Sequence, residues 1–231
     1  MTISYRGEGS NVGFTNSLIV TMSATAQDGD HLIATACFDG LSATFTWPSG
    51  FTERGYLSGG TDHQTVAWAD KVAGASEPST YTIGVGSTKD FVVSVTARSG
   101  VDTTTPRDVT PTAQILTSGA SPWNVTGLGL ASGTANRWLV WIGAVDNIGS
   151  GTVTSAVPSA SPDTWTERID ASNGFWVNTA VCDCLDAAGT YTSDVTGVQT
   201  LGVVNGDPFA FLIALRPFAG GSSATTAWLR A

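Results

Sequence analysis

The sequence FTER at Phe51–Arg54 returns as WTER at Trp165–Arg168, at the same place in two matching halves of the chain. Four further features recur in the same order around each copy, and such a series is hard to obtain by chance, so the sequence predicts an internal duplication. These features are hydrophobic runs after a polar pair (His31–Ala34 and Trp138–Trp141), Ala-rich stretches that end in an acid (Asp70 and Asp183), Tyr-Thr pairs (Tyr81-Thr82 and Tyr191-Thr192), and runs from Phe to Arg (Phe91–Arg98 and Phe209–Arg216). None of the repeated positions resembles a reaction centre, which favours a scaffold.

Strand-length segments rich in Val, Thr, Ile and aromatic residues recur at roughly ten-residue spacing, with Gly, Asp, Ser or Pro between them. No window of useful length has the apolar spacing and caps of a helix. The pattern predicts an all-β fold, a jelly-roll-like β-sandwich built from two internal repeats. The expected strands are Leu18–Met22, His31–Phe38, Thr44–Trp47, Thr65–Lys71, Thr80–Val85, Phe91–Arg98, Trp138–Val145, Thr164–Ile169, Phe175–Leu185, Thr190–Val195 and Phe209–Leu215.

The chain of 231 residues is long enough for one large sandwich, and 42% hydrophobic residues with a mean hydropathy of +0.11 are ample for a buried core. Each half offers only five or six short strands, so we expect one shared core rather than two separate domains. The prediction is a single domain over 1–231, with repeat 1 at about 13–108, a crossover at 109–123, repeat 2 at about 124–218 and a tail at 219–231.

The charge balance excludes some classes of partner. The net charge is −9, and the ten Lys and Arg residues form no cluster that could follow a nucleic-acid backbone. We therefore expect no nucleic-acid binding, and no membrane insertion because the apolar runs are short and interrupted by polar residues. The residues after Met1 lack a basic region followed by an apolar one. We expect the mature chain to begin at Met1 and to fold in the cytoplasm of the producing cell.

The three cysteines are expected to be free thiols. Cys182 and Cys184 are two positions apart on an expected strand, so they lie roughly 6.5–7 Å apart, too far for an unstrained disulfide. Cys37 has no evident partner, and neither histidine is close in sequence to the Cys182 pair. We interpret all three as small buried residues rather than metal ligands. The segment Asp28–Asp30 lacks the spacing of a calcium loop and is interpreted as a turn.

Residues with catalytic potential do not form a known constellation. The chain has no Gly-x-Ser-x-Gly elbow, and His31 and His63 fall at a strand start and in a Gly-rich loop. Glu53 and Glu167 are equivalent in the two halves, but glycosidase chemistry needs its two carboxyl groups within about 5–10 Å. We interpret them as surface residues at strand ends, where cross-strand ion pairs are an option. The sequence predicts no enzymatic activity, no cofactor and no metal site.

The last run, Phe209–Leu215, is apolar on both faces, whereas Phe91–Arg98 alternates and is expected to be half exposed. A loop, a neighbouring subunit or another partner must therefore cover its second face. The second half also has the longer loops, at 147–163 and 195–207. We predict that the second half carries the contact surface. The candidate interface residues are Phe209, Phe211, Leu212, Ala214 and Trp228.

A family resemblance is carried by a series of short motifs that spans about residues 15–218. The motifs are GDHLIA at Gly29–Ala34, WPSGFT at Trp47–Thr52, KVAGASEP at Lys71–Pro78, RSGVDTTTP at Arg98–Pro106 and ALRP at Ala214–Pro217. This series resembles a group of duplicated β-sandwich proteins of tailed bacteriophages, prophages and bacterial surfaces, whose members are described as virion or minor tail proteins. The second half departs from WPSG, with PSASP at Pro158–Pro162 instead. The resemblance brings no catalytic motif with it.

The resemblance implies a structural protein of the bacteriophage virion, either tail-associated (a minor tail protein) or a head decoration component, assembled in the host cytoplasm. The expected partners are other virion proteins and copies of the chain, with a host-surface glycan as an additional candidate. The alternative is a carbohydrate-binding module or adhesin, because aromatic side chains on a sandwich stack on sugars as well as on proteins. Four tryptophans near strand ends, loops or the tail leave that choice open: Trp47, Trp123, Trp165 and Trp228.

Overall fold

The computed structural model describes most of the chain, and the described part is all β, with no helix in it. The prediction of an all-β sandwich is therefore confirmed. Backbone alone is described for 123–128, 153–158 and 195–201. The described residues are 2–60, 63–115, 123–128, 130–146, 153–158, 165–173, 177–187, 189, 195–201 and 208–219.

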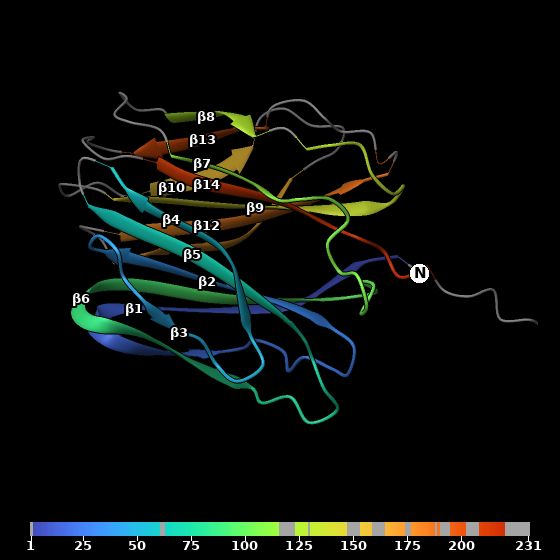
Figure 1. Cartoon of the computed structure of the whole chain (residues 1–231), viewed down its shortest axis with the longest axis horizontal. Coiled ribbons are helices and arrows are strands. Elements are labelled where there is room, and N and C mark those ends of the chain that lie inside the picture. The colour runs from blue at the N-terminus through green and yellow to red at the C-terminus, as the bar shows by residue number, and fades with distance from the viewer. Residues whose placement is uncertain are drawn as a thin grey trace, which may run out of the picture.

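The strands form three antiparallel sheets (Figure 1). A six-stranded sheet has the order β1-β6-β2-β5-β4, with β3 also paired to β6; a five-stranded sheet has the order β11-β12-β9-β14-β7; and a three-stranded sheet has the order β10-β13-β8. The strand bounds are β1 Ser4–Thr21, β2 His31–Asp39, β3 Phe45–Thr46, β4 Thr52–Gly59, β5 Gln64–Val72, β6 Thr80–Ser99, β7 Thr112–Ile115, β8 Trp123–Leu128, β9 Arg137–Asp146, β10 Val153–Pro158, β11 Thr166–Ser172, β12 Val177–Asp186, β13 Val195–Leu201 and β14 Pro208–Leu215.

The six-stranded sheet folds over on itself because β1 and β6 are long enough to bend. The start of β6 (80–85) pairs with the end of β1 and with β3, whereas its end (91–99) pairs with the start of β1 and with β2. The two halves of β1 approach so closely that a Cβ on Gly9 would lie 2.2 Å from the carbonyl oxygen of Thr21. A first core fills this fold, and its large members are Leu32, Phe38, Phe45, Tyr81, Ile83 and Phe91.

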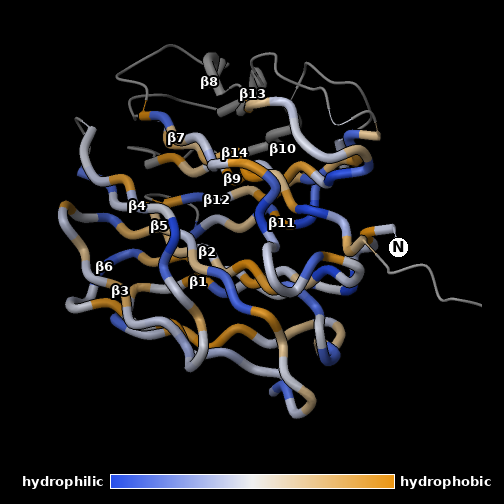
Figure 2. The backbone as a smooth tube through the Cα atoms, turned by 45° about the vertical axis from the view of Figure 1, so that its right-hand side comes forward, coloured by the Kyte–Doolittle hydropathy of each residue, from blue (hydrophilic) through white to orange (hydrophobic). Residues whose placement is uncertain are grey.

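A second core lies between the six-stranded and five-stranded sheets, where Ile33, Trp68 and Val92 pack with Ile142 and Phe211. Hydrophobic residues run through the strands on both sides of this contact (Figure 2). The six-stranded sheet comes from the first half of the chain, and the five-stranded sheet comes from the second half except for β7 in the crossover, so the two halves share this core.

The end of β6 is buried on both faces, contrary to the expectation of a half-exposed strand. Phe91, Val93, Val95 and Ala97 belong to the first core, as the alternation predicts. The opposite face carries Ser94, Thr96 and Arg98, which are also buried because the five-stranded sheet lies against them.

A third core lies on the outer face of the five-stranded sheet. The buried side chains of β14 on this face, Ala210, Leu212 and Ala214, cluster with Trp141, Trp165 and others. The three-stranded sheet lies beyond this face, on the side away from the six-stranded sheet (Figure 1). The double apolar face of β14 is therefore covered within the chain.

The two large sheets have the same internal order, since β4-β5-β2-β6 corresponds to β11-β12-β9-β14. A bulge follows Glu53 in β4 and Glu167 in β11 at the same register. The arginine that ends the last repeated run is displaced by one residue between the two halves. Arg98 lies opposite His31 in β2, whereas the residue opposite Trp138, the counterpart of His31 in β9, is Leu215, one position before Arg216. A shift of one residue moves a side chain to the other face of its sheet. The duplication itself remains a prediction from the sequence. A duplication would give both sheets the same strand order and the same bulges.

The cysteine prediction is confirmed: Cys37, Cys182 and Cys184 are buried thiols, and none of them forms a disulfide. Burial also raises the pKa of the Cys182 thiol, which disfavours the reactive thiolate. We expect no rapid reaction of the native protein with a thiol reagent, and three reactive groups after unfolding in guanidinium chloride. Rapid labelling of even one thiol in the folded protein would contradict the burial.

Candidate functional site

Two buried carboxylates occupy equivalent places in the two large sheets, Asp70 on β5 and Asp183 on β12. Each accepts a hydrogen bond from the arginine that lies at the neighbouring bulge. The Nε of Arg54 donates to Asp70 over 2.7 Å, and the Nε of Arg168 donates to Asp183 over 2.9 Å. The repeated tetrapeptide therefore supplies the arginine, and the repeated Ala-rich stretch supplies its acid.

Asp183 is sealed inside the molecule. Arg98, from the facing sheet, donates from Nη2 over 2.8 Å and from Nε over 3.2 Å, and both partners of this pair are 0% exposed. The Nη1 of Arg98 donates to the hydroxyl of Thr96. The ring of Tyr5 covers Arg168, with 4.0 Å between the ring centroid and Cζ. Burial lowers the pKa of Arg98, against the raising effect of Asp183. This pair joins the two large sheets.

Asp70 is also buried but borders an open pocket of about 260 Å³. In addition to Arg54, it contacts Nε2 of His31 at 3.3 Å and Nη1 of Arg107. His31, Arg54 and Arg107 all line the pocket, together with Lys71. The first half therefore has a cationic pocket at the position where the second half has a sealed ion pair.

The protonation states in this pocket follow from burial and charge. Burial alone would raise the pKa of Asp70, but hydrogen bonds from His31 and Arg54 and the charge of Arg107 lower it to about 2. Burial lowers the pKa of His31, against the raising effect of Asp70. Asp70 is thus ionised and His31 neutral at pH 7.

These pKa shifts predict a loss of stability in acid. The lowered pKa of Asp70 stabilises the fold fully above the unfolded value of 3.8, and the contribution disappears as pH falls towards about 2. We expect Asp70→Asn to be destabilised at pH 7 by on the order of 2 kcal/mol. The difference from the native protein should shrink between pH 4 and pH 2, measured by urea unfolding. A difference that is constant with pH would contradict the ionised Asp70.

The arrangement offers hydrogen-bond donors to a ligand. The Nδ1 of His31 has no hydrogen-bond partner among the described residues, so His31 activates no hydroxyl or thiol there. Both oxygens of Asp70 are occupied by arginines. The pocket therefore presents N–H donors and positive charge.

Two consecutive residues just before the crossover, Arg107 and Asp108, form ion pairs with different halves of the chain. Arg107 pairs with Asp70 of the first half. Asp108 accepts from the Nε of Arg216 at 3.1 Å and from the amide nitrogen of Thr134 at 2.6 Å. Burial opposes ionisation of Asp108, but the bonds from Thr134 and Arg216 lower its pKa. The neighbouring Arg107 and Asp108 thus hold opposite sides of the molecule.

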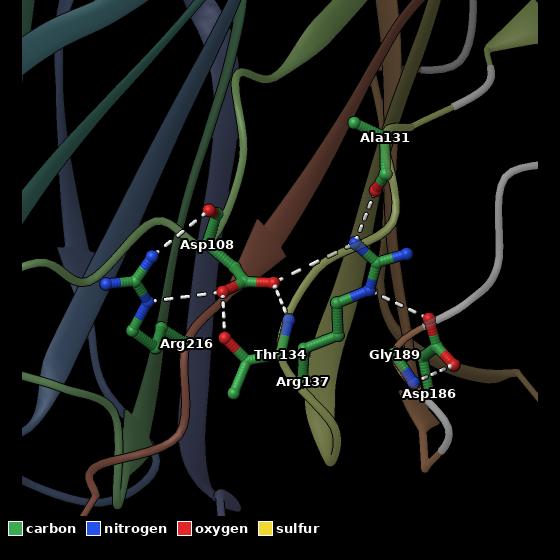
Figure 3. Close-up of polar contacts among 7 residues, drawn as sticks. All are labelled: Asp108, Ala131, Thr134, Arg137, Asp186, Gly189 and Arg216. Carbon is green, nitrogen blue, oxygen red and sulfur yellow. Dashed lines mark hydrogen bonds and ion pairs between the residues drawn. The ribbon is translucent and has the colours of Figure 1, made fainter.

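A buried arginine extends this network. Arg137 donates from Nε to Asp186 over 2.8 Å and from Nη1 to the carbonyl oxygen of Ala131 over 2.7 Å, and it lies 3.8 Å from Asp108 (Figure 3). Asp186 also accepts from the amide of Gly189. The network fixes the ends of β9, β12 and β14 and is structural.

The predicted interface residues lie elsewhere than expected. Phe209, Phe211, Leu212 and Ala214 are buried within the chain, in the second and third cores, so in this fold they offer no surface to a partner. The physical reason is the stacking of one sheet on each face of β14. Trp228 and the loop at 147–152 and 159–163 lie outside the described residues.

The paired glutamates lie near strand ends, as interpreted: Glu53 is exposed at the start of β4, and Glu167 is half-buried at the start of β11. Glu53 accepts a hydrogen bond from the Nε1 of Trp47, and the ion pairs of the described residues include neither Glu53 nor Glu167. The neighbouring arginines instead reach the buried aspartates. The sequence contained the signal for these pairs, because both the arginine and the aspartate recur in the two halves.

Comparison of the chain with protein-family models, with curated proteins and with solved structures gives no match. Within the described ranges, no group of three or more His, Cys, Asp or Glu side chains is placed to hold a metal ion. The described part of the chain likewise has no helix with the length and apolar character needed to cross a membrane.

Proposed function

We propose that the chain is a non-catalytic structural protein of a bacteriophage virion, tail-associated or on the head surface. The observation that carries the scaffold role is the buried Arg98–Asp183 pair, which together with the shared core joins the two large sheets. The two fully buried arginines, Arg98 and Arg137, are each paired with a carboxylate of the protein. The motifs from Gly29–Ala34 to Ala214–Pro217 support the virion assignment through their resemblance to phage tail proteins.

The described surface contains apolar side chains that an assembly contact would use. On β1, Phe14 is 71% exposed and Ile19 56% exposed, and Val12 lies nearby in sequence. We expect contacts with copies of the chain or with other virion proteins at this surface of β1 rather than at β14.

Particle composition tests this proposal. We expect mass spectrometry of purified, nuclease-treated particles from a host that makes the chain to find it in a fixed ratio to a tail or head protein after those fractions are separated. Its complete recovery in the particle-free lysate would contradict a virion role.

A carbohydrate-binding protein is the second candidate, and the Asp70 pocket is the observation that favours it. A binding module should recognise its sugar as a purified monomer, without any particle. A purely structural protein has no such requirement, so binding by the isolated chain distinguishes the two functions.

A further inference from the structure

The pocket beside Asp70 concentrates positive charge in an acidic protein. The chain has ten Lys and Arg against 19 Asp and Glu, yet Arg54, Lys71 and Arg107 line this one pocket. Lys71 is neutralised by Glu77, with 2.7 Å between Nζ and Oε1. Arg54 and Arg107 share the single carboxylate of Asp70, which leaves one positive charge unbalanced.

The two arginines have unused donors. The described hydrogen bonds of Arg54 come from Nε, and those of Arg107 from Nη1, and both end on Asp70. Their side chains are 37% and 27% exposed, and both line the pocket. A guanidinium carries five N–H donors, so each has several left for a ligand.

The second half provides an internal comparison. At its Asp183 site, Arg98 from the first half uses Nε, Nη1 and Nη2 within the protein, and the ring of Tyr5 covers Arg168. The residue in the place of His31 is Trp138. The Asp183 site shows that a structural ion pair does not need a pocket beside it. The pocket beside Asp70 therefore requires another explanation.

The lining indicates the ligand. Planar guanidinium groups match a carboxylate in two parallel hydrogen bonds. Thr52, Thr103 and Thr104 also line the pocket, and hydroxyl groups suit the hydroxyls of a sugar. The volume of about 260 Å³ is just below the usual range of about 300–1,000 Å³ for ligand pockets, which favours one sugar unit. The net charge of −9 opposes a highly charged polyanion.

We propose that the Asp70 pocket binds the carboxylate of an acidic sugar, with Arg54 and Arg107 as the carboxylate ligands. The inference deepens the second candidate function and is independent of the virion role: failure to bind sugar leaves the particle test unaffected.

Calorimetric titration of the full chain with D-glucuronate, D-glucose and acetate tests the proposal. We expect D-glucuronate to bind with a dissociation constant on the order of 1 mM and more tightly than either other probe. Equal affinity for acetate would overturn the sugar assignment, and equal affinity for D-glucose would overturn the role of the carboxylate. If the folded protein showed no heat of binding with D-glucuronate at about ten times the expected dissociation constant, the proposal as a whole would be overturned.

Variants locate the site. Arg54→Gln should weaken D-glucuronate binding roughly tenfold or more, because a charge-assisted bond is lost. Arg54→Lys keeps the positive charge but loses the planar guanidinium group, so it should weaken D-glucuronate binding less than Arg54→Gln does. This variant gives a second measurement if Arg54→Gln does not fold. The matched control is Lys89→Gln, which removes one exposed charge paired loosely with Asp39 at 3.8 Å. An unchanged affinity in Arg54→Lys and Arg54→Gln, or an equal loss in Lys89→Gln, would overturn the site.

Discussion

Replacing Asp183 by Ala should destabilise the protein by about 3–5 kcal/mol, because it leaves Arg98 charged, buried and without its carboxylate. The guanidinium of Arg98 is 0% exposed and cannot turn to water without separating the two large sheets. Arg168 loses the same partner but is partly exposed and can be hydrated. Equilibrium unfolding in urea measures the change directly.

Two further variants separate the buried charge from the lost contact. The double variant Arg98→Met, Asp183→Leu removes both charges, and we expect it to recover most of the loss, since apolar replacement of a whole buried pair is often neutral. Asp39→Ala removes a partly exposed acid whose ion pair with the exposed Lys89 is long, and should cost less than about 1 kcal/mol. A loss in Asp183→Ala no larger than in Asp39→Ala would mean that Arg98 is accessible to water.

Much of the fold was predictable from local pattern. Alternating and β-branched runs identify β2, β5, β9 and β14, because these strands are central in their sheets and consist mostly of buried residues. The edge strand β4 lacks that signal: Thr52–Gly59 is polar and pairs on one side only, with β5. The expected strands Thr80–Val85 and Phe91–Arg98 are the two halves of β6, since a bend does not interrupt hydrogen bonding.

The candidate site was predictable only in part. The recurrence of Arg54 and Asp70 as Arg168 and Asp183 is visible in the sequence, and the structure pairs them as the repeats suggest. The position of Arg98 was not predictable, because alternation says only that it lies on the face opposite Phe91. Whether that face meets water or a second sheet depends on tertiary packing, which local periodicity does not encode.

The same reason explains the error about β14. A strand that is apolar on both faces must be covered, but local pattern does not identify what covers it. In this chain the six-stranded sheet lies on one side, and the third core lies on the other. The surplus of apolar residues in the second half thus reflects three stacked sheets rather than a docking surface.

Leu212→Asp should abolish folding of the isolated chain. Leu212 is 0% exposed, lies opposite Trp141 in the sheet and belongs to the third core. Loss of a buried leucine costs about 2–5 kcal/mol, and burial of a carboxyl group without a partner adds several more. The sum approaches the total stability of about 5–15 kcal/mol that is usual for a folded domain.

The matched control for Leu212→Asp is Leu41→Asp, because Leu41 is 48% exposed and should accept the charge at a cost below about 1 kcal/mol. Leu212→Ala should remain folded with a loss of about 2–5 kcal/mol, which reports on the packing without the charge. Soluble expression, near-ultraviolet circular dichroism and urea unfolding of the three variants provide the comparison. If Leu212→Asp were as soluble and stable as Leu41→Asp, the outer face of β14 would be open in the single chain, and a partner would have to cover it instead. Because the outer face of β14 is buried beside Trp141, we expect Leu212→Asp to fail to fold.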